Sequence, residues 1–143
     1  MYEIILNLHS YWAYLVLFVL LLAVINSLGG LFGKKEYSAK SFRIALFALI
    51  VSHIQFLIAI ILYFVSPKFS WWAEGNVMGE SIQRLYLVEH PLMNLIAIAL
   101  ITIGYSKHKK KLTSISKYKT IAIFYTIALL FFLSRIPWDV WPR

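Results

Sequence analysis

Residues 84–111 read RLYLVEHPLMNLIAIALITIGYSKHKKK, an apolar run that contains Glu89, His90 and Pro91 and ends in a block of lysines. A carboxyl group and an imidazole at membrane depth each cost several kcal/mol unless they are paired, ligated or protonated. An ionisable residue inside a span is therefore a candidate functional residue. The stretch predicts a membrane-spanning helix that carries a functional site. Other parts of the chain have to supply partners for its ionisable side chains.

The composition agrees with a small integral membrane protein. The chain has 143 residues, of which 61% are hydrophobic and 14% are charged, which is too apolar for a soluble domain of this size. There is no cysteine, so disulfides, thiolate metal sites and covalently attached haem are excluded. The net charge of +8 comes from lysines and arginines that cluster beside apolar runs. This pattern indicates membrane topology and a lipid bilayer as partner, with no nucleic acid.

Four apolar runs are each long enough to cross a bilayer, and short linkers join them. We expect an all-α, up-down-up-down four-helix bundle in which residues 1–143 form one domain. The glycine pair Gly29 and Gly30 favours the end of the first helix. Pro91 is expected to bend the third helix, which begins near residues 81–84, and to free the carbonyl group of Leu87. The four spans are expected at about residues 4–28, 44–65, 83–105 and 120–136.

The charges of the linkers predict the orientation. The first and third linkers lie on one side and carry ten lysines and arginines, whereas the opposite side carries four, namely Lys68, Arg84, Arg135 and Arg143. Basic linkers stay in the cytoplasm. Both termini are therefore expected on the outer, periplasmic side of a bacterial inner membrane that the chain crosses several times. His108, within the lysine block, is expected to be a solvated loop residue.

Three histidines, His9, His53 and His90, fall in three different spans. Imidazoles from separate helices that meet inside a membrane bundle are typical ligands of haem b or of a divalent metal. Counted at 1.5 Å per residue from the basic ends of the helices, His9 lies roughly 28 Å, His90 roughly 25 Å and His53 roughly 15 Å up. His9 and His90 are thus the preferred axial pair, with His53 as an alternative or additional ligand.

Charged side chains near His90 extend this prediction. By the same count Arg135 reaches the level of His90 and Arg84 lies above it, so either arginine would pair with haem propionates. Glu89 has three possible roles: an ion pair with Arg84 or Arg135, the orientation of a histidine on a neighbouring helix, or proton transfer in a quinol reaction. A non-haem metal site, a proton-coupled transport site and a purely structural set of histidines remain open.

Several segments resemble the small four-span membrane proteins of Bacteroidota that are catalogued as cytochrome b. The family's recurring segments of the type LHS, HIQ and EH-x-LM fall on His9, His53 and the pair Glu89-His90. The resemblance implies haem b and a role in membrane electron transfer. It is carried by LHSYWAYLVL (8–17), SHIQFLIAIILYFVSP (52–67), VEHPLMNLIAIALITIG (88–104) and TIALLFFLSRIPW (126–138).

Together these observations predict a haem b protein that relays electrons between quinol and a periplasmic or membrane partner. The chain contains no glycine-rich phosphate loop and no nucleophile paired with a base, so an electron carrier or a complex subunit is favoured over a stand-alone enzyme. The competing hypothesis is a non-catalytic subunit of a larger cell-envelope complex, in which the histidines serve helix packing alone.

Overall fold

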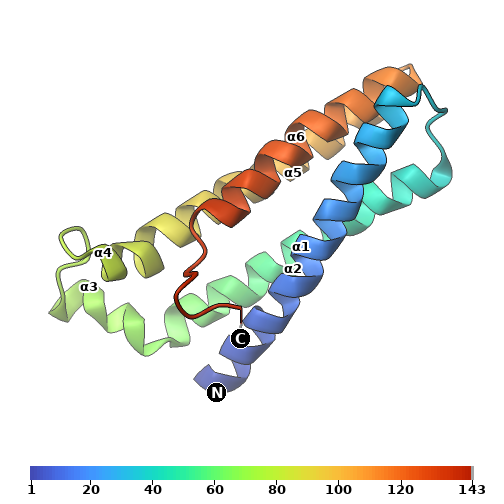
Figure 1. The fold of residues 1–143 in the computed structure, drawn as a ribbon. Coiled ribbons are helices and arrows are strands. Elements are labelled where there is room, and N and C mark those ends of the chain that lie inside the picture. The colour runs from blue at the N-terminus through green and yellow to red at the C-terminus, as the bar shows by residue number, and fades with distance from the viewer. Residues whose placement is uncertain (143) are drawn as a thin grey trace.

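The computed structural model describes residues 1–142, which form helices and connections without a β-strand (Figure 1). Four helical stretches are long and apolar enough to cross a membrane. The predicted all-α, four-span architecture is confirmed. The stretches are α1 (Tyr2–Phe32), α2 (Ala39–Val65), the continuous stretch Ser81–Lys109 and α6 (Ser114–Ser134).

The third stretch consists of α4 (Ser81–Arg84), a π-helical turn η2 (Leu85–Glu89) and α5 (His90–Lys109). Before it, the longest connection folds into a short 3-10 helix, η1 (Pro67–Ser70), and a single turn, α3 (Trp71–Glu74). The side chain of Ser66 caps η1, and Pro67 occupies its first turn, where a missing backbone N–H costs nothing.

The helices pack as antiparallel neighbours. α1 lies between α2 and α6, and α5 packs against α6 and, less extensively, against α2. The two basic linkers lie at one end of the bundle, whereas both termini lie toward the other half (Figure 1). The backbone N–H of Tyr37 donates to Ser114 Oγ at 2.8 Å and ties the two linkers together. The predicted division of the chain into a basic end and an end with the termini is therefore present in the fold.

The core combines small residues such as Ala48 and Ala97 with a buried aromatic residue, Tyr125. Large apolar residues such as Phe18, Leu57 and Leu130 are exposed on the outside. An apolar exterior of this kind suits helices whose outer faces contact lipid. Gly104 illustrates the tight interior, because a Cβ added to it would lie 2.4 Å from Cβ of Phe124. This glycine lets α5 and α6 approach closely.

The predicted end of the first helix at Gly29 and Gly30 is wrong. α1 continues to Phe32, and Gly33 forms its C-cap. A Cβ on Gly30 would lie 2.3 Å from the ring of Tyr118 in α6, whereas a Cβ on Gly29 would meet nothing within 4 Å. Gly30 therefore makes room for a neighbouring helix and does not end its own.

His108 is also placed differently from the prediction of a solvated loop residue. It lies within α5 and is fully buried. Its ring stacks on Phe42 and contacts Tyr37 and Tyr105, with centroid distances of 5.7, 5.5 and 5.0 Å. Burial, together with the nearby hydroxyl groups of Tyr118 and Tyr105, raises the pKa of Tyr37. Aromatic packing thus draws one residue of the lysine block into the protein.

Candidate functional site

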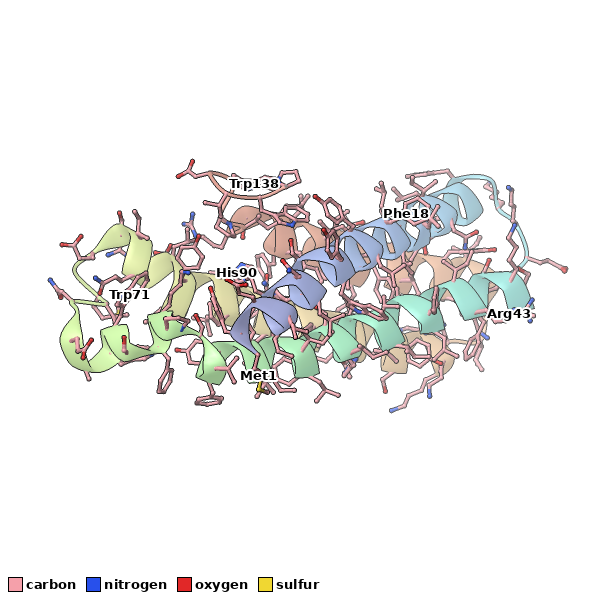
Figure 2. The ribbon with its side chains drawn as sticks, turned by 90° about the horizontal axis from the view of Figure 1, so that it is seen from below. Met1, Phe18, Arg43, Trp71, His90 and Trp138 are labelled. Atoms are coloured by element: carbon pink, nitrogen blue, oxygen red, sulfur yellow. The ribbon has the colours of Figure 1, made fainter. Side chains whose placement is uncertain are left out.

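A cavity of about 530 Å³ lies in the half of the bundle that contains the termini, between α1, α2, the η2–α5 region and the segment after α6. Its wall is mostly apolar, with a few polar side chains, as is typical of sites for small molecules and cofactors. In Figure 2, His90 lies in the same half as Met1, Trp71 and Trp138, and Arg43 lies at the opposite end. The polar residues that reach the cavity from three of the long helices include His9, Ser10, Gln55, His90 and Asn94, and Lys68 reaches it from η1.

His9 and His90 meet in this cavity. Their ring centroids are 6.2 Å apart, and the ring planes are nearly perpendicular, at 84°. The two residues come from α1 and α5, which are separated in the chain but run through the same bundle. The count of helical rise, which placed both histidines at one level, is consistent with this contact.

Backbone and side-chain contacts fix the ring of His90. Its Nδ1 is 2.9 Å from the carbonyl oxygen of Arg135, which only accepts hydrogen bonds, so Nδ1 carries the hydrogen and donates it. In the neutral ring Nε2 is then the nitrogen with a free electron pair. Asn94, one turn further along α5, places Nδ2 3.1 Å from that nitrogen and donates to it. The arrangement leaves Nε2 as the ring nitrogen that can bind a ligand.

Polar atoms around the cavity lack partners. Gln55 Nε2 donates to the backbone carbonyl of His9 at 2.8 Å, which fixes α2 against α1 at this level. By contrast, His9 Nδ1, Gln55 Oε1 and Asn94 Oδ1 are buried and have no hydrogen-bond partner among the described residues. Buried polar atoms are almost always satisfied in folded proteins. Three such atoms belong to side chains that line this cavity.

The structure does not bring His53 to this site. Its side chain is exposed on the outside of α2, where Nδ1 donates to the carbonyl of Leu49 at 2.8 Å and Nε2 lies 3.3 Å from Thr102 Oγ1. Its neighbours Ser52 and Gln55 are buried instead. Of the three histidines in the spans, His9 and His90 converge, and His53 stands apart from them.

Glu89 forms the ion pair that was one of its three predicted roles. Its carboxylate oxygens lie 2.9 Å from Arg84 Nε and 3.7 Å from Arg135 Nε. Arg84 also donates to the carbonyl of Met78 at 2.8 Å. Neither arginine is among the residues that line the cavity. Both guanidinium groups are thus already paired with a carboxylate.

The helix that carries His90 is irregular just before it. Pro91 has no N–H to donate, and the carbonyl of Leu87 instead accepts a hydrogen bond of 2.9 Å from the hydroxyl of Tyr63 in α2. The backbone N–H of His90 bonds to the carbonyl of Leu85, five residues back, as a π-helical turn requires. The sequence predicted the freed carbonyl, but neither its partner nor the π turn.

Sequence reasoning missed the contribution of the C-terminal segment. Trp141 donates from Nε1 to Ser10 Oγ at 2.9 Å and packs on Tyr14 at a centroid distance of 4.7 Å. With Ile136 and Val140 it forms part of the cavity wall. Tryptophans near the end of a span are typical of the membrane interface, so their presence in the sequence does not indicate a place in a cavity wall. One feature of the sequence points to this segment, since Pro137 ends a helix close to the level of His90. This feature does not distinguish Trp141 from the other residues of the segment.

Within residues 1–142, no group of three or more histidine, aspartate or glutamate side chains is placed to hold a metal ion. Comparisons with models of protein families, with curated proteins and with solved structures find no match. Function therefore has to be inferred from the cavity and its two histidines.

Proposed function

We propose that the protein binds haem b between His9 and His90 and relays single electrons across the outer half of a bacterial inner membrane. The observation that supports this proposal most strongly is the meeting of two imidazoles from different helices in an apolar cavity, 6.2 Å apart. Two histidines from separate helices would hold the iron of haem b. The resemblance to small membrane proteins catalogued as cytochrome b agrees with this reading.

The residues present fit this group. His9 and His90 would hold the iron through one imidazole nitrogen each. Their ring centroids lie 6.2 Å apart, so both imidazoles reach the same part of the cavity. Apolar side chains wall the cavity, and the unpartnered polar atoms of His9 and Asn94 lie beside it. Iron at His90 Nε2 would replace the hydrogen bond from Asn94.

The protein's own groups hold the two imidazoles in place. The Arg135 carbonyl fixes the tautomer and orientation of His90, as outer hydrogen bonds do for metal-binding histidines in general. Gln55 holds the backbone of α1 at His9 from the opposite side. Held by His9 and His90, haem b would supply single-electron transfer. The site is therefore suited to electron transfer.

The placement of the cavity suggests the partners. With the basic linkers in the cytoplasm, the cavity lies in the periplasmic half of the membrane. Quinol, which dissolves in the bilayer, is then the electron donor, and a periplasmic or membrane protein is the acceptor. The ion pair of Glu89 with two arginines lies next to His90 and stabilises this end of the helix.

A reduced-minus-oxidised absorbance spectrum of the purified full-length protein tests the proposal. After expression with an adequate haem supply, we expect the bands of a six-coordinate haem b. His90→Ala and His9→Ala should each lose most of the haem, because one axial ligand is missing. His53→Ala is the matched control and should keep it, because His53 is exposed on the outer face of α2.

Two results would contradict the proposal. A wild-type protein without a haem band would favour an accessory subunit of an envelope complex. Full retention of haem by folded His90→Ala would remove the central ligand assignment, and thermal unfolding of each variant shows whether it is folded.

A further inference from the structure

One cation at this end of the bundle has a different environment from the others. Lys68 lies in η1 and lines the cavity, whereas Arg84 and Arg135 do not. No carboxylate within residues 1–142 lies within 4 Å of its ammonium group, since the ion pairs found there are those of Glu89 with the two arginines. Lys68 therefore brings a positive charge without a carboxylate partner to a cavity whose wall is mostly apolar.

The position of Lys68 is fixed by its surroundings. Its backbone N–H bonds to Ser66 Oγ at 3.2 Å. The next residue, Phe69, packs against Tyr63 and Phe64 with centroid distances of 5.7 and 5.3 Å. These contacts hold η1 in place and so fix the backbone from which the Lys68 side chain extends.

Aromatic rings hold the ammonium group itself. Lys68 Nζ lies 4.9 Å from the ring centroid of Tyr86 and 6.0 Å from that of Trp71. Cation–π contacts stabilise an ammonium group only modestly, so they position the charge without neutralising it. Tyr86 also lines the cavity. The side chain is thus held at the cavity by contacts that leave its hydrogen-bond donors available.

We propose that Lys68 binds the anionic group of the cavity's ligand, which is a haem propionate, and that Arg84 and Arg135 do not. This inference rests on the proposed function. The chemistry matches, because haem has a large apolar body and two carboxylates, and the cavity has apolar walls and one lysine without a carboxylate partner. A charge-assisted hydrogen bond between Lys68 and a propionate would add to the two axial bonds.

Release of haem to an excess of apomyoglobin tests this inference, with haem dimethyl ester, whose propionates are uncharged, as the second ligand. We expect the wild-type protein to release the ester about tenfold faster than haem, a typical effect of one hydrogen bond to a charged group. Lys68→Met should release both ligands at that faster rate. Lys68→Arg should restore slow release of haem, and Lys110→Met, at the opposite end of the bundle, should behave as the wild type.

The outcomes separate this inference from the proposed function. If wild-type protein binds haem and its ester equally tightly and Lys68→Met releases haem as slowly as wild type, the role of Lys68 is refuted while haem binding stands. If the wild-type protein binds neither ligand, both proposals fail. The wild-type comparison of the two ligands shows whether the propionate charge contributes, and the slow release restored by Lys68→Arg shows that a folded protein needs a cation at position 68.

Discussion

At the scale of single residues, Pro91 determines which hydrogen bonds its neighbours form. In a membrane an unpaired backbone carbonyl is costly, because lipid offers no hydrogen-bond donor. The carbonyl of Leu87, left without its usual partner, accepts from the Tyr63 hydroxyl, and that hydroxyl in turn accepts from Trp72 Nε1 at 2.9 Å. This chain of two hydrogen bonds joins α2 to the helix that carries His90.

Tyr63→Phe should therefore destabilise the protein by about 1–3 kcal/mol, because it leaves the Leu87 carbonyl and the Trp72 N–H unpaired. The measurement is thermal unfolding in detergent, where a lower midpoint is expected. Tyr11→Phe is the control, since it removes the same atom from a side chain that is 70% exposed. Equal midpoints for the two variants would show that the bond to Leu87 contributes nothing.

The histidines show how far single residues could be placed from the sequence. The depth of a residue in the membrane can be predicted from the sequence, because the rise per residue of a helix is constant. His9 and His90, which were predicted at one level, lie next to each other. It is harder to predict which face of a membrane helix is buried in the protein, because both the core side and the lipid side are apolar. The buried positions Ala48, Ser52 and Gln55 follow a helical spacing of small and polar residues, and His53 falls off it. This spacing in the sequence indicates that His53 lies off the buried face of α2.

At the scale of helices, the small residues decide how closely neighbours approach. Glycine often marks the end of a helix, because it has no Cβ and adopts the left-handed backbone conformation there without strain. Inside this bundle Gly30 instead faces the ring of Tyr118. Tyr118 cannot easily move, because its hydroxyl lies 3.0 Å from Ser41 Oγ and donates to the Glu36 carbonyl at 2.9 Å. The sequence could not predict this role, since it depends on which helix lies opposite.

Gly30→Ala should lower the unfolding midpoint, because its methyl group would overlap the Tyr118 ring and cost about 1–3 kcal/mol. The adjacent Gly29→Ala is the matched control. Its methyl group meets nothing within 4 Å, so the better helix propensity of alanine should stabilise the protein by up to about 1 kcal/mol. Thermal unfolding of both variants gives opposite shifts if Gly30 acts through packing, and shifts of one sign would contradict that role.

At the scale of the whole molecule, the two ends of the bundle differ in structure. The end with the basic linkers is closed by aromatic packing around His108 and by a hydrogen bond between the linkers. The other end holds the cavity, η1, α3 and the segment after α6. Composition and periodicity predicted four spans and the clustering of charge. They could not predict the folded-back segment with Trp141, because a short aromatic tail suits a lipid interface equally well.

The orientation of the molecule in the membrane is a prediction of its charge distribution. The chain lacks cysteine, so any cysteine introduced is a unique label. Lys110→Cys and Glu74→Cys change exposed residues at opposite ends of the bundle. With basic linkers in the cytoplasm, a membrane-impermeant maleimide added to intact bacterial cells lacking an outer-membrane barrier should label the protein at position 74 and leave position 110 unlabelled.

Permeabilised cells supply the control for accessibility, because both cysteines should then react to a similar extent. Labelling at position 110 but not at position 74 in intact cells would place the cavity in the cytoplasmic half. Electron delivery to a periplasmic acceptor would then be ruled out, whereas the pairing of His9 with His90 would be unaffected. The labelling pattern therefore tests the direction of electron transfer independently of whether haem is bound.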